Sequence, residues 1–542
     1  MNILGLMGGT RVGYQDASAA LLKNGKLISF VEEERVGRVK HAPGTLPERA
    51  IRFILNNENI SIRDVDYVVS HGITWEPDFR KSLREFFYSK FGDCPKNIEL
   101  VYHHDAHCAS AYYASGFNEA MIFSADYSGD GISTQLATGL NGKIMIKQTI
   151  ERPNSLGIFY ALMTEYCGFL KDNDEYKVMG LSSYGDKEKF DFSWLLEIND
   201  GIYQLNTEYI KGHKPGEPGV TKQIPVYNQQ LIKKLGPPRG PGDPMTEYYK
   251  NIAASAQKHL ENVIVSIITK FHKDTGLRKL CLAGGVALNV VVNQKLMNLD
   301  FIDEIYIQPA ANDAGISLGA AYIIASQLGE DIDALPHVYY GPGYSNNEIE
   351  AALKMANVNY VRIDDVASYA AQKVATNNVV GWFQGKMEFG PRALGNRSIL
   401  ANPTNREMQD IVNTKIKFRE EFRPFCPSVI EEEAMLYVKG KSKVSPYMTI
   451  TYDVKENYIG KLPSVTHVDN STRIQTVNHE QNLLYYNYLC ELKKHIGIGV
   501  TLNTSFNVKG DPIVNTPFQA LATFYGSGMD TLIIGNFVIN KK

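Results

Sequence analysis

Two histidines with the spacing of metal ligands suggest the first chemistry in this chain. His103 and His107 are four residues apart in an alanine-rich segment that predicts a helix. Positions i and i+4 lie on one face of an α-helix, so both imidazoles can reach a single cation. The alternative is a helix with two partly exposed histidines and no metal. A catalytic metal usually takes at least three protein ligands, so further ligands are needed.

Two aspartates are candidates for the missing ligands. Asp126 follows the apolar run 120–125 and precedes a glycine turn at 129–131, a pattern typical of the end of a strand. Asp313 opens a segment of small residues that predicts another helix. With these carboxylates added, we expect His103, His107 and Asp126 to bind one divalent metal, with Asp313 as a fourth ligand.

Glycine turns elsewhere suit a nucleotide. The strand predicted at 3–7 leads into Gly8-Gly9, and Asp16 precedes a second strand, as in the phosphate-facing hairpin of the actin-like ATPase fold. A strand at 280–283, a Gly-Gly turn and a helix follow one another later, an order that holds phosphate or adenosine against a helix amino terminus. The residues predicted to contact the nucleotide are Gly129, Gly131, Lys177, Gly284, Gly285, Asn289 and Asn312.

Basic residues among glycines predict a second site, for a small dianion. A Pro/Gly cluster at 335–344 marks a domain boundary, which divides the chain into residues 1–340 and 341–542. Arginine forks match phosphate and carboxylate oxygens bidentately. A plain basic surface is the alternative. The residues predicted to form this anion site are Arg392, Arg397, Ser398, Lys415, Arg423, His467, Arg473, Asn503 and Asn507.

Composition describes an ordinary globular protein. The 542 residues are too many for one core, and 44% are hydrophobic and 21% charged. The net charge of −3 argues against a nucleic-acid partner, and no apolar run has membrane length. Six scattered cysteines without a C-x-x-C pair favour reduced thiols in the cytoplasm. No internal repeat is visible, and a Gly/Pro/Lys-rich segment at 200–245 predicts a surface excursion that shapes a substrate site.

Six motifs in one order carry a resemblance to a known family. The chain closely resembles the O-carbamoyltransferases, the family of nodulation protein U, cephem carbamoyltransferase and tobramycin carbamoyltransferase, over nearly its whole length. The motifs are Glu32-Glu-Glu-Arg35, His103-x-x-x-His107, Glu175-Tyr-Lys-Val-Met-Gly-Leu181, Ala283-Gly-Gly-Val-Ala-Leu-Asn289, Gly390-Pro-Arg-Ala-Leu-Gly-Asn-Arg-Ser398 and Asn503-Thr-Ser-Phe-Asn507.

The resemblance implies an α/β protein with two domains. The first would be an actin-like ATPase domain similar to threonylcarbamoyladenosine synthase, and the second a smaller YrdC-like domain. By the same resemblance, the second domain makes carbamoyl adenylate from carbamoyl phosphate and ATP at the anion site. The first domain then transfers the carbamoyl group to a hydroxyl of a small molecule, sugar or antibiotic. The expected metals are Fe²⁺ at the His/Asp ligands and Mg²⁺ with ATP, and a homodimer is compatible with these expectations.

One position departs from the family. Gln15 stands where relatives often have His, and an amide cannot act as a general base. We therefore expect other groups at the reacting hydroxyl, with Lys40, His41 and Asp16 as the candidate catalytic residues.

Two other functions use the same folds. One is threonylcarbamoyl transfer to tRNA, which the near-neutral charge and the absence of a basic stripe oppose. The other is a nucleotide-binding regulatory scaffold of the hydrogenase-maturation type, which would be expected to carry paired cysteines.

Overall fold

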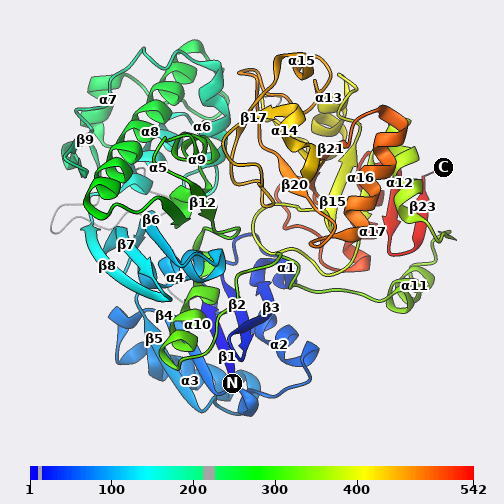
Figure 1. Ribbon diagram of the computed structural model, residues 1–542, viewed down its shortest axis with the longest axis horizontal. Helices are drawn as coiled ribbons and strands as arrows, with labels where there is room; N and C mark the ends of the chain where they lie inside the picture. The colour runs from blue at the N-terminus through cyan, green and yellow to red at the C-terminus, as the bar shows by residue number, and fades with distance from the viewer. Residues whose placement is uncertain (10–14, 212–225, 421, 542) are drawn as a thin grey trace. The chain divides into compact units, whose positions relative to one another are not determined.

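The chain forms two compact units (Figure 1). The computed structural model describes residues 1–9, 15–211, 226–420 and 422–541. Unit 1 comprises residues 1–26, 43–46 and 60–334, and unit 2 comprises residues 27–42, 47–59 and 335–542. The second unit therefore combines an early piece of the chain with the carboxy-terminal part.

Unit 1 contains the same strand arrangement twice. In sheet order, the strands of the first copy are β2 (Ser18–Lys23), β1 (Asn2–Met7), β4 (Tyr67–His71) and β5 (Asn97–Val101). The strands of the second copy are β7 (Ile132–Leu140), β6 (Glu119–Gly129), β11 (Lys279–Ala283) and β12 (Glu304–Ile307). In each copy the first pair is antiparallel and the next two pairs are parallel. This duplication agrees with the predicted actin-like ATPase fold, although the sequence shows no repeat.

Two helices at the centre of unit 1 pack unusually closely. They are α4 (His103–Ser115) and α10 (Ile316–Gln327), and α10 also packs on β1. A Cβ at Gly319 of α10 would lie 1.8 Å from the carbonyl oxygen of Ala106 on α4, so only glycine fits there. Small residues thus bring the start of α10 close to the histidines of α4.

The rest of unit 1 surrounds this centre. The 29-residue helix α8 (Glu247–Thr275) buries one of its faces. None of the helices in the described ranges is long and apolar enough to cross a membrane. The remaining strands and longer helices of unit 1 are β8 (Lys143–Glu151), β9 (Leu196–Asn199), β10 (Ile202–Leu205), α3 (Asp78–Phe91), α5 (Leu156–Tyr166), α6 (Glu175–Leu181), α7 (Gln229–Leu235), α8 (Glu247–Thr275) and α9 (Val290–Met297).

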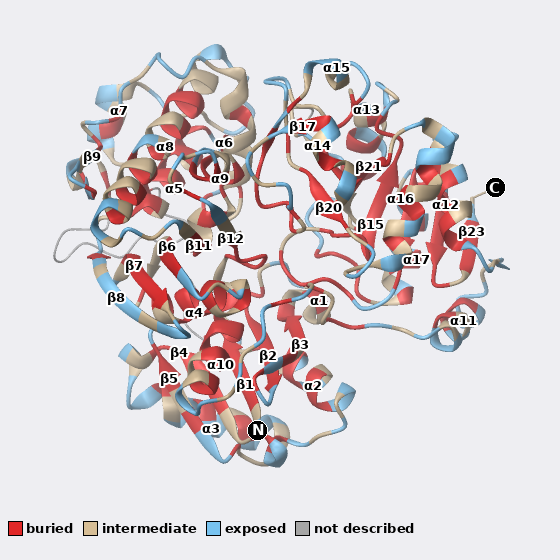
Figure 2. Ribbon diagram, viewed as in Figure 1, coloured by how far each residue is buried: buried red, intermediate tan, exposed pale blue. Residues whose placement is uncertain are grey.

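Unit 2 is built on an eight-stranded mixed sheet. In sheet order its strands are β13 (Val361–Arg362), β23 (Phe537–Asn540), β22 (Thr531–Ile534), β14 (Val380–Phe383), β15 (Arg397–Ala401), β21 (Val500–Ser505), β16 (Cys426–Ile430) and β20 (Gln475–Val477). Its longer helices are α11 (Asn346–Met355), α12 (Val366–Ala375), α16 (Leu483–Ile496) and α17 (Pro517–Tyr525). Helices α12 and α16 pack together over a buried core that includes Trp382, Tyr485 and Tyr488 (Figure 2).

An early segment completes unit 2. It consists of most of β3 (Lys26–Glu32) and the helices α1 (Glu33–Gly37) and α2 (Glu48–Asn57). Phe30 of β3 stacks on Phe389 with ring centroids 4.3 Å apart, and Arg35 of α1 donates to the carbonyl of Gly390 at 2.8 Å. These contacts place the early segment against the loop that precedes β15.

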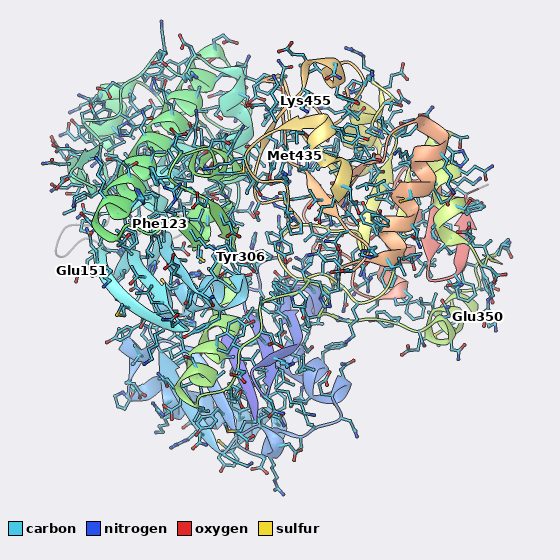
Figure 3. All side chains as sticks on the ribbon, in the orientation of Figure 1. Phe123, Glu151, Tyr306, Glu350, Met435 and Lys455 are labelled. Atoms are coloured by element: carbon cyan, nitrogen blue, oxygen red, sulfur yellow. The ribbon has the colours of Figure 1, made fainter. Side chains whose placement is uncertain are left out.

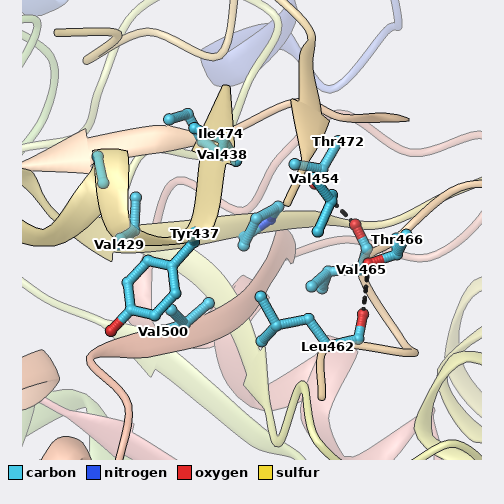
Figure 4. Close-up of a pocket in the computed structure, with 12 residues that line it drawn as sticks. Val429, Tyr437, Val438, Val454, Leu462, Val465, Thr466, Thr472, Ile474 and Val500 are labelled. Carbon is cyan, nitrogen blue, oxygen red and sulfur yellow. Dashed lines mark hydrogen bonds between the residues drawn. The ribbon is translucent and has the colours of Figure 1, made fainter. Parts of the chain in front are cut away.

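A small three-stranded sheet, β17 (Val438–Lys439), β18 (Tyr452–Val454) and β19 (Ser471–Thr472), lies in the same unit. Near it, Lys455 donates to the carbonyl of Met435 at 2.6 Å (Figure 3). Apolar side chains such as Val429, Val454 and Leu462 line a cavity of about 10 Å³ (Figure 4). That volume holds about one water molecule, so the cavity is a packing defect and not a substrate site.

Candidate functional site

The structure gathers the four predicted metal ligands of unit 1 in one place. One ligand atom from each of His103, His107, Asp126 and Asp313 lies within 4.8 Å of the others. His107 Nε2 is 3.3 Å from Asp126 Oδ2 and 3.6 Å from Asp313 Oδ1. His103 Nε2 is 3.5 Å from the same Asp313 oxygen. The side chains come from α4, from β6 and from the turn that leads into α10.

The two imidazoles are buried without hydrogen-bond partners. His103 is 2% exposed and His107 is fully buried, which excludes the alternative of partly exposed helix histidines. Both ring nitrogens of each lack a hydrogen bond, although buried polar groups normally have one. Two such imidazoles facing two carboxylates fit a divalent transition-metal ion, for which nitrogen and oxygen donors are suitable ligands.

Burial and mutual charge shift the pKa values of the cluster in opposite directions. Burial lowers the pKa of His107, but the Asp126 and Asp313 carboxylates outweigh it and raise the pKa to about 9. Burial and the Asp126 charge raise the pKa of Asp313 to about 7. Burial, together with the neighbouring histidines, lowers the pKa of His103 well below its usual range. A bound cation would displace protons from His107 and Asp313, so cation and protons compete for this cluster.

Close backbone approach fixes the ligands. A Cβ at Gly129, the last residue of β6, would lie 2.1 Å from Cγ of His103, so the strand reaches the ring only through a glycine. The backbone N–H of Gly285 donates to Asp126 Oδ2 at 3.1 Å and orients that carboxylate. Gly129 and Gly285 were predicted to contact a nucleotide, and in these contacts they support metal-ligand side chains.

In unit 2 a buried lysine, Lys417, lies beside Asn507, one of the predicted anion-site residues. Lys417 ends a π-helical turn, Asn413–Lys417, and its side chain is buried. Its Nζ donates to the carbonyl and hydroxyl oxygens of Ser505 and to the carbonyl and Oδ1 of Asn507, four uncharged acceptors. Burial, and then the charges of Arg419 and Arg423, lower the pKa of Lys417 well below its usual range. Three basic side chains therefore lie near one another beside Asn507.

Arg397 has a different environment from the one predicted. Its guanidinium is fully buried and stacks on Phe383, with Cζ 3.7 Å from the ring centroid. Both Nη atoms donate to backbone carbonyls, those of Gln384, Asn396, Pro342 and Gly385. A phosphate would have to displace these bonds, so the geometry gives Arg397 a role in shaping its loop. Its carbamoyl phosphate contact stays a prediction without support from the geometry.

The other predicted anion ligands are spread over unit 2. Ser398 Oγ accepts from the N–H of Gly395, and the Asn503 amide donates to Ala393, Ser428 and Gln475. Arg473 Nε donates to the sulfur of Cys426 at 3.1 Å. The remaining predicted ligands are Arg392, which is half-buried, Lys415, which is exposed, Arg423, 3.6 Å from Glu420, and His467, 3.4 Å from Asp469.

Comparison with known proteins places the chain in a family. The family model "Carbamoyltransferase N-terminus" matches residues 6–85 and 74–322, and "Carbamoyltransferase C-terminus" matches residues 371–541. The chain belongs to the carbamoyltransferase family. The carbamoyltransferase is 37% identical to the uncharacterized protein sll1178 of Synechocystis, over 97% of this chain and 95% of that one. It is 34% identical to the nodulation protein NolNO of Sinorhizobium fredii, over 97% of this chain and 79% of that one.

Solved structures are more distant from the carbamoyltransferase. Component A of (R)-2-hydroxyglutaryl-CoA dehydratase from Acidaminococcus fermentans has 16% identity to it and a TM-score of 0.36, over 60% of this chain and 99% of that one. The fold is therefore identified by the order and direction of its own strands.

The predicted nucleotide residues of the carbamoyltransferase have different surroundings. Asn289 caps α9 and exchanges side-chain hydrogen bonds with Gln257, which is a structural role. Asn312 precedes the metal-ligand candidate Asp313, and its Oδ1 is buried without a hydrogen bond. For the other residues, contact with a nucleotide stays a prediction. Gly131 and Gly284 have φ of +85° and +84°, and Lys177 pairs with Asp174 at 3.0 Å.

The candidate catalytic residues belong to different units of the carbamoyltransferase. Asp16 is in unit 1, and its charge is among those that raise the pKa of Asp313, which places it near the metal cluster. Lys40 and His41 are in unit 2, where Lys40 is exposed and the His41 backbone N–H donates to Glu34 at 2.7 Å. The side-chain amide of Gln15 donates to the carbonyl of Asp172 at 3.3 Å.

Two polar segments, residues 32–41 and 200–245, differ in how much of them the structure describes. In the polar segment 32–41, Glu32 and Arg35 are buried and paired with each other, and Arg38 donates to the carbonyls of Pro512 and Ile513. The centre of the predicted excursion at 200–245 lies outside the described residues, which resume at Val226.

Sequence reasoning missed three polar residues that organise the sites. His71 lies edge-on to His103 with ring centroids 5.9 Å apart, and Asp130 Oδ2 accepts from the His103 backbone N–H at 2.8 Å. Glu388 Oε1 accepts from the N–H groups of Leu394, Asn396 and Arg397 and shapes the loop before β15. A signal existed for Asp130, because it stands in the Asp-Gly dipeptide of a tight hairpin.

Proposed function

We propose that this carbamoyltransferase is ATP-dependent and transfers its carbamoyl group to a hydroxyl oxygen of a small molecule or sugar. The observation that carries the proposal is the convergence of His103, His107, Asp126 and Asp313 in the unit that the family's N-terminal model matches. Unit 2, with its basic residues around Lys417, is proposed to form the activated intermediate.

Activation is needed because a carbamate is a poor electrophile. In the proposed first stage, water cleaves carbamoyl phosphate to carbamate and inorganic phosphate. A carbamate oxygen then attacks the α-phosphate of ATP, which forms carbamoyl adenylate and releases pyrophosphate. Both substrates are anions, so a desolvated site with several cations suits them.

Lys417 is the residue in unit 2 best suited to hold these anions. Its four acceptors are uncharged, so its positive charge has no carboxylate among them to neutralise it. An incoming phosphate would supply that missing charge and restore the protonated amine. Arg423 and Asn507 belong to the same neighbourhood and are proposed to assist.

Transfer is assigned to unit 1. The acceptor oxygen attacks the carbonyl carbon of carbamoyl adenylate, the bond to AMP breaks, and the hydroxyl proton leaves to a base. Asp16 is the proposed base, because it lies near the metal cluster and Gln15 cannot titrate. His103, His107, Asp126 and Asp313 would hold a divalent cation, Fe²⁺ by the family resemblance, which supplies Lewis-acid stabilisation of the charge on the departing AMP.

Release of pyrophosphate tests the proposal without knowledge of the acceptor. The purified protein with ATP and Mg²⁺ should release pyrophosphate only when carbamoyl phosphate is added. Lys417→Met should lower this rate by at least about 100-fold, the effect of losing one electrostatic contact to the reacting group. Lys494→Met, which removes an exposed lysine paired with Glu491 on α16, should not change it. Absence of carbamoyl-phosphate-dependent pyrophosphate from the wild-type protein would refute the proposal.

A further inference from the structure

The hairpin between β6 and β7 is tied to the amino terminus of α4 by one carboxylate. Gly129 pairs with Ile132, so Asp130 and Gly131 are the two turn residues, with φ of +52° and +85°. Two positive φ values define a type I′ turn, for which Asp-Gly is a preferred sequence. Asp130 Oδ2 accepts the backbone N–H of His103 at 2.8 Å, and Thr74 donates its hydroxyl to Oδ1.

This bond replaces the cap that α4 otherwise lacks. The helix begins at His103 after Tyr102, whose side chain makes no capping bond. The first N–H groups of a helix have no partner within it, and a carboxylate at that end is also favoured by the helix dipole. One negative charge at the amino terminus of α4 therefore comes from another element and lies next to a candidate metal ligand.

The same turn belongs to the strand that carries another ligand. Asp126 of β6 lies four residues before Asp130, within the irregularity in the pairing between Ala125 and Gly129. Regular pairing is interrupted over this stretch, so the β ladder by itself does not hold Asp126 in register. The bond from Asp130 to His103 thus links the strand of Asp126 to the helix of His103 and His107.

We propose that Asp130 is a positioning residue of the metal centre, which fixes the distance between the carboxylate of Asp126 and the imidazoles of α4. The inference rests on the proposed metal centre and adds to it a residue that contacts neither the cation nor a substrate. Groups outside the ligand set typically change metal affinity by about 10–100-fold when removed, because they orient the ligands.

Titration of metal-free protein with Co²⁺ tests this inference without any activity assay. The wild-type protein should bind one equivalent and give the visible absorption of a site with nitrogen and oxygen ligands, and His103→Ala should abolish it. Asp130→Ala should bind Co²⁺ about 10–100-fold more weakly, with a changed absorption spectrum. Asp130→Asn keeps an oxygen that can accept from the His103 N–H, so it should recover most of the affinity.

A matched control separates positioning from stability. Ser345→Ala removes the cap of α11 in unit 2, where Ser345 Oγ accepts from Glu348, and should destabilise the protein without changing its Co²⁺ affinity. Wild-type affinity and spectrum in Asp130→Ala, with loss of binding in His103→Ala, would overturn the positioning role alone. Failure of the wild-type protein to bind Co²⁺ would overturn the metal centre and this inference with it. If Asp130→Ala does not fold, Asp130→Gly takes its place with the same two outcomes, because glycine removes the carboxylate and suits the positive φ of this turn position.

Discussion

At the scale of single residues, hydrogen bonding decides which buried polar groups can bind a ligand. His103 and His107 have buried nitrogens without hydrogen bonds, whereas Arg397 is just as buried but bonded through both Nη atoms. The nitrogens of the two histidines are therefore available to bind a metal ion. The Nη atoms of Arg397 already donate to backbone carbonyls. Residue type and spacing alone do not distinguish the two cases.

Loss of one ligand should empty the metal centre. His103→Ala and Asp126→Asn are expected to weaken metal binding by more than about 100-fold, because removal of even an outer group costs 10–100-fold. Elemental analysis after equilibration with Fe²⁺ measures the bound metal. His104→Asn is the matched control, since His104 lies on the same helix but contacts Ser124 and the Ile132 carbonyl. Full occupancy in both ligand variants would contradict the assignment.

Glu175 should make stability depend on pH. Burial raises the pKa of its carboxyl to about 7, above the value of about 4.5 expected in the unfolded chain. The folded state therefore keeps the proton longer, and the stability this contributes is present below pH 4.5 and is lost as pH rises toward 7. Glu175→Gln removes the titration and should unfold with up to about 3 kcal/mol more free energy than the wild type at pH 8.

Urea unfolding of both proteins at pH 4.5 and pH 8 measures this difference. The variant and the wild type should agree closely at the lower pH and diverge at the higher one. An equal difference at the two pH values would show that folding does not raise the pKa of Glu175.

At the scale of elements, close packing sets the ligand geometry. Asp313 begins the short turn before α10, and α10 contacts α4 where Gly319 meets Ala106. The separation of these two helices thus controls the distance from Asp313 to the histidines. A methyl group added at Gly319 should therefore move the carboxylate of Asp313, which lies six residues earlier in the chain.

Gly319→Ala should therefore reduce both stability and metal affinity. The added Cβ would lie 1.8 Å from the Ala106 carbonyl oxygen, and overpacking of this kind costs about 1–3 kcal/mol or more. Thermal unfolding and Co²⁺ titration measure the two effects. Gly460→Ala, at a position with open space around it, should change neither. Unaltered stability in Gly319→Ala would show that the helices can separate freely.

The sequence predicted the residues of the candidate metal site better than the residues that hold them in place. The histidine spacing and the position of Asp126 after an apolar run are local patterns, so both could be inferred without a structure, although the strand continues to Gly129. Asp130 as a helix cap, and the four oxygens around Lys417, depend on elements far apart in the chain, and no local pattern encodes them. The duplicated strand order is equally hidden, because hydrogen-bond topology is preserved when the side chains of two copies have diverged.

At the scale of the whole molecule, the units do not follow the order of the chain. Unit 2 includes residues 27–42 and 47–59, which the predicted division at residue 340 assigns to the other domain. Arg38 donates to the carbonyl of Ile513, 475 residues later, and Phe30 stacks on Phe389. Residues 335–542 alone would leave these partners without their contacts.

A fragment of residues 335–542 should therefore unfold with low cooperativity. Fusing residues 27–59 to its amino terminus through a flexible Gly/Ser linker should restore a cooperative transition, because the contacts of Phe30, Arg35 and Arg38 become intramolecular again. Urea titration followed by tryptophan fluorescence compares the two, with Trp382 as the probe in the core. The same midpoint and slope in both fragments would contradict the prediction.

The early segment of unit 2 also imposes a delay during synthesis. At about 5–20 residues per second, the ribosome makes Ile513 roughly 20–100 s after Arg38. Most of unit 1 is translated in that interval and can fold while residues 27–59 still lack their partners. Phe30 lacks its stacking partner Phe389 for much of that time, so this stretch is where a nascent chain would need a chaperone.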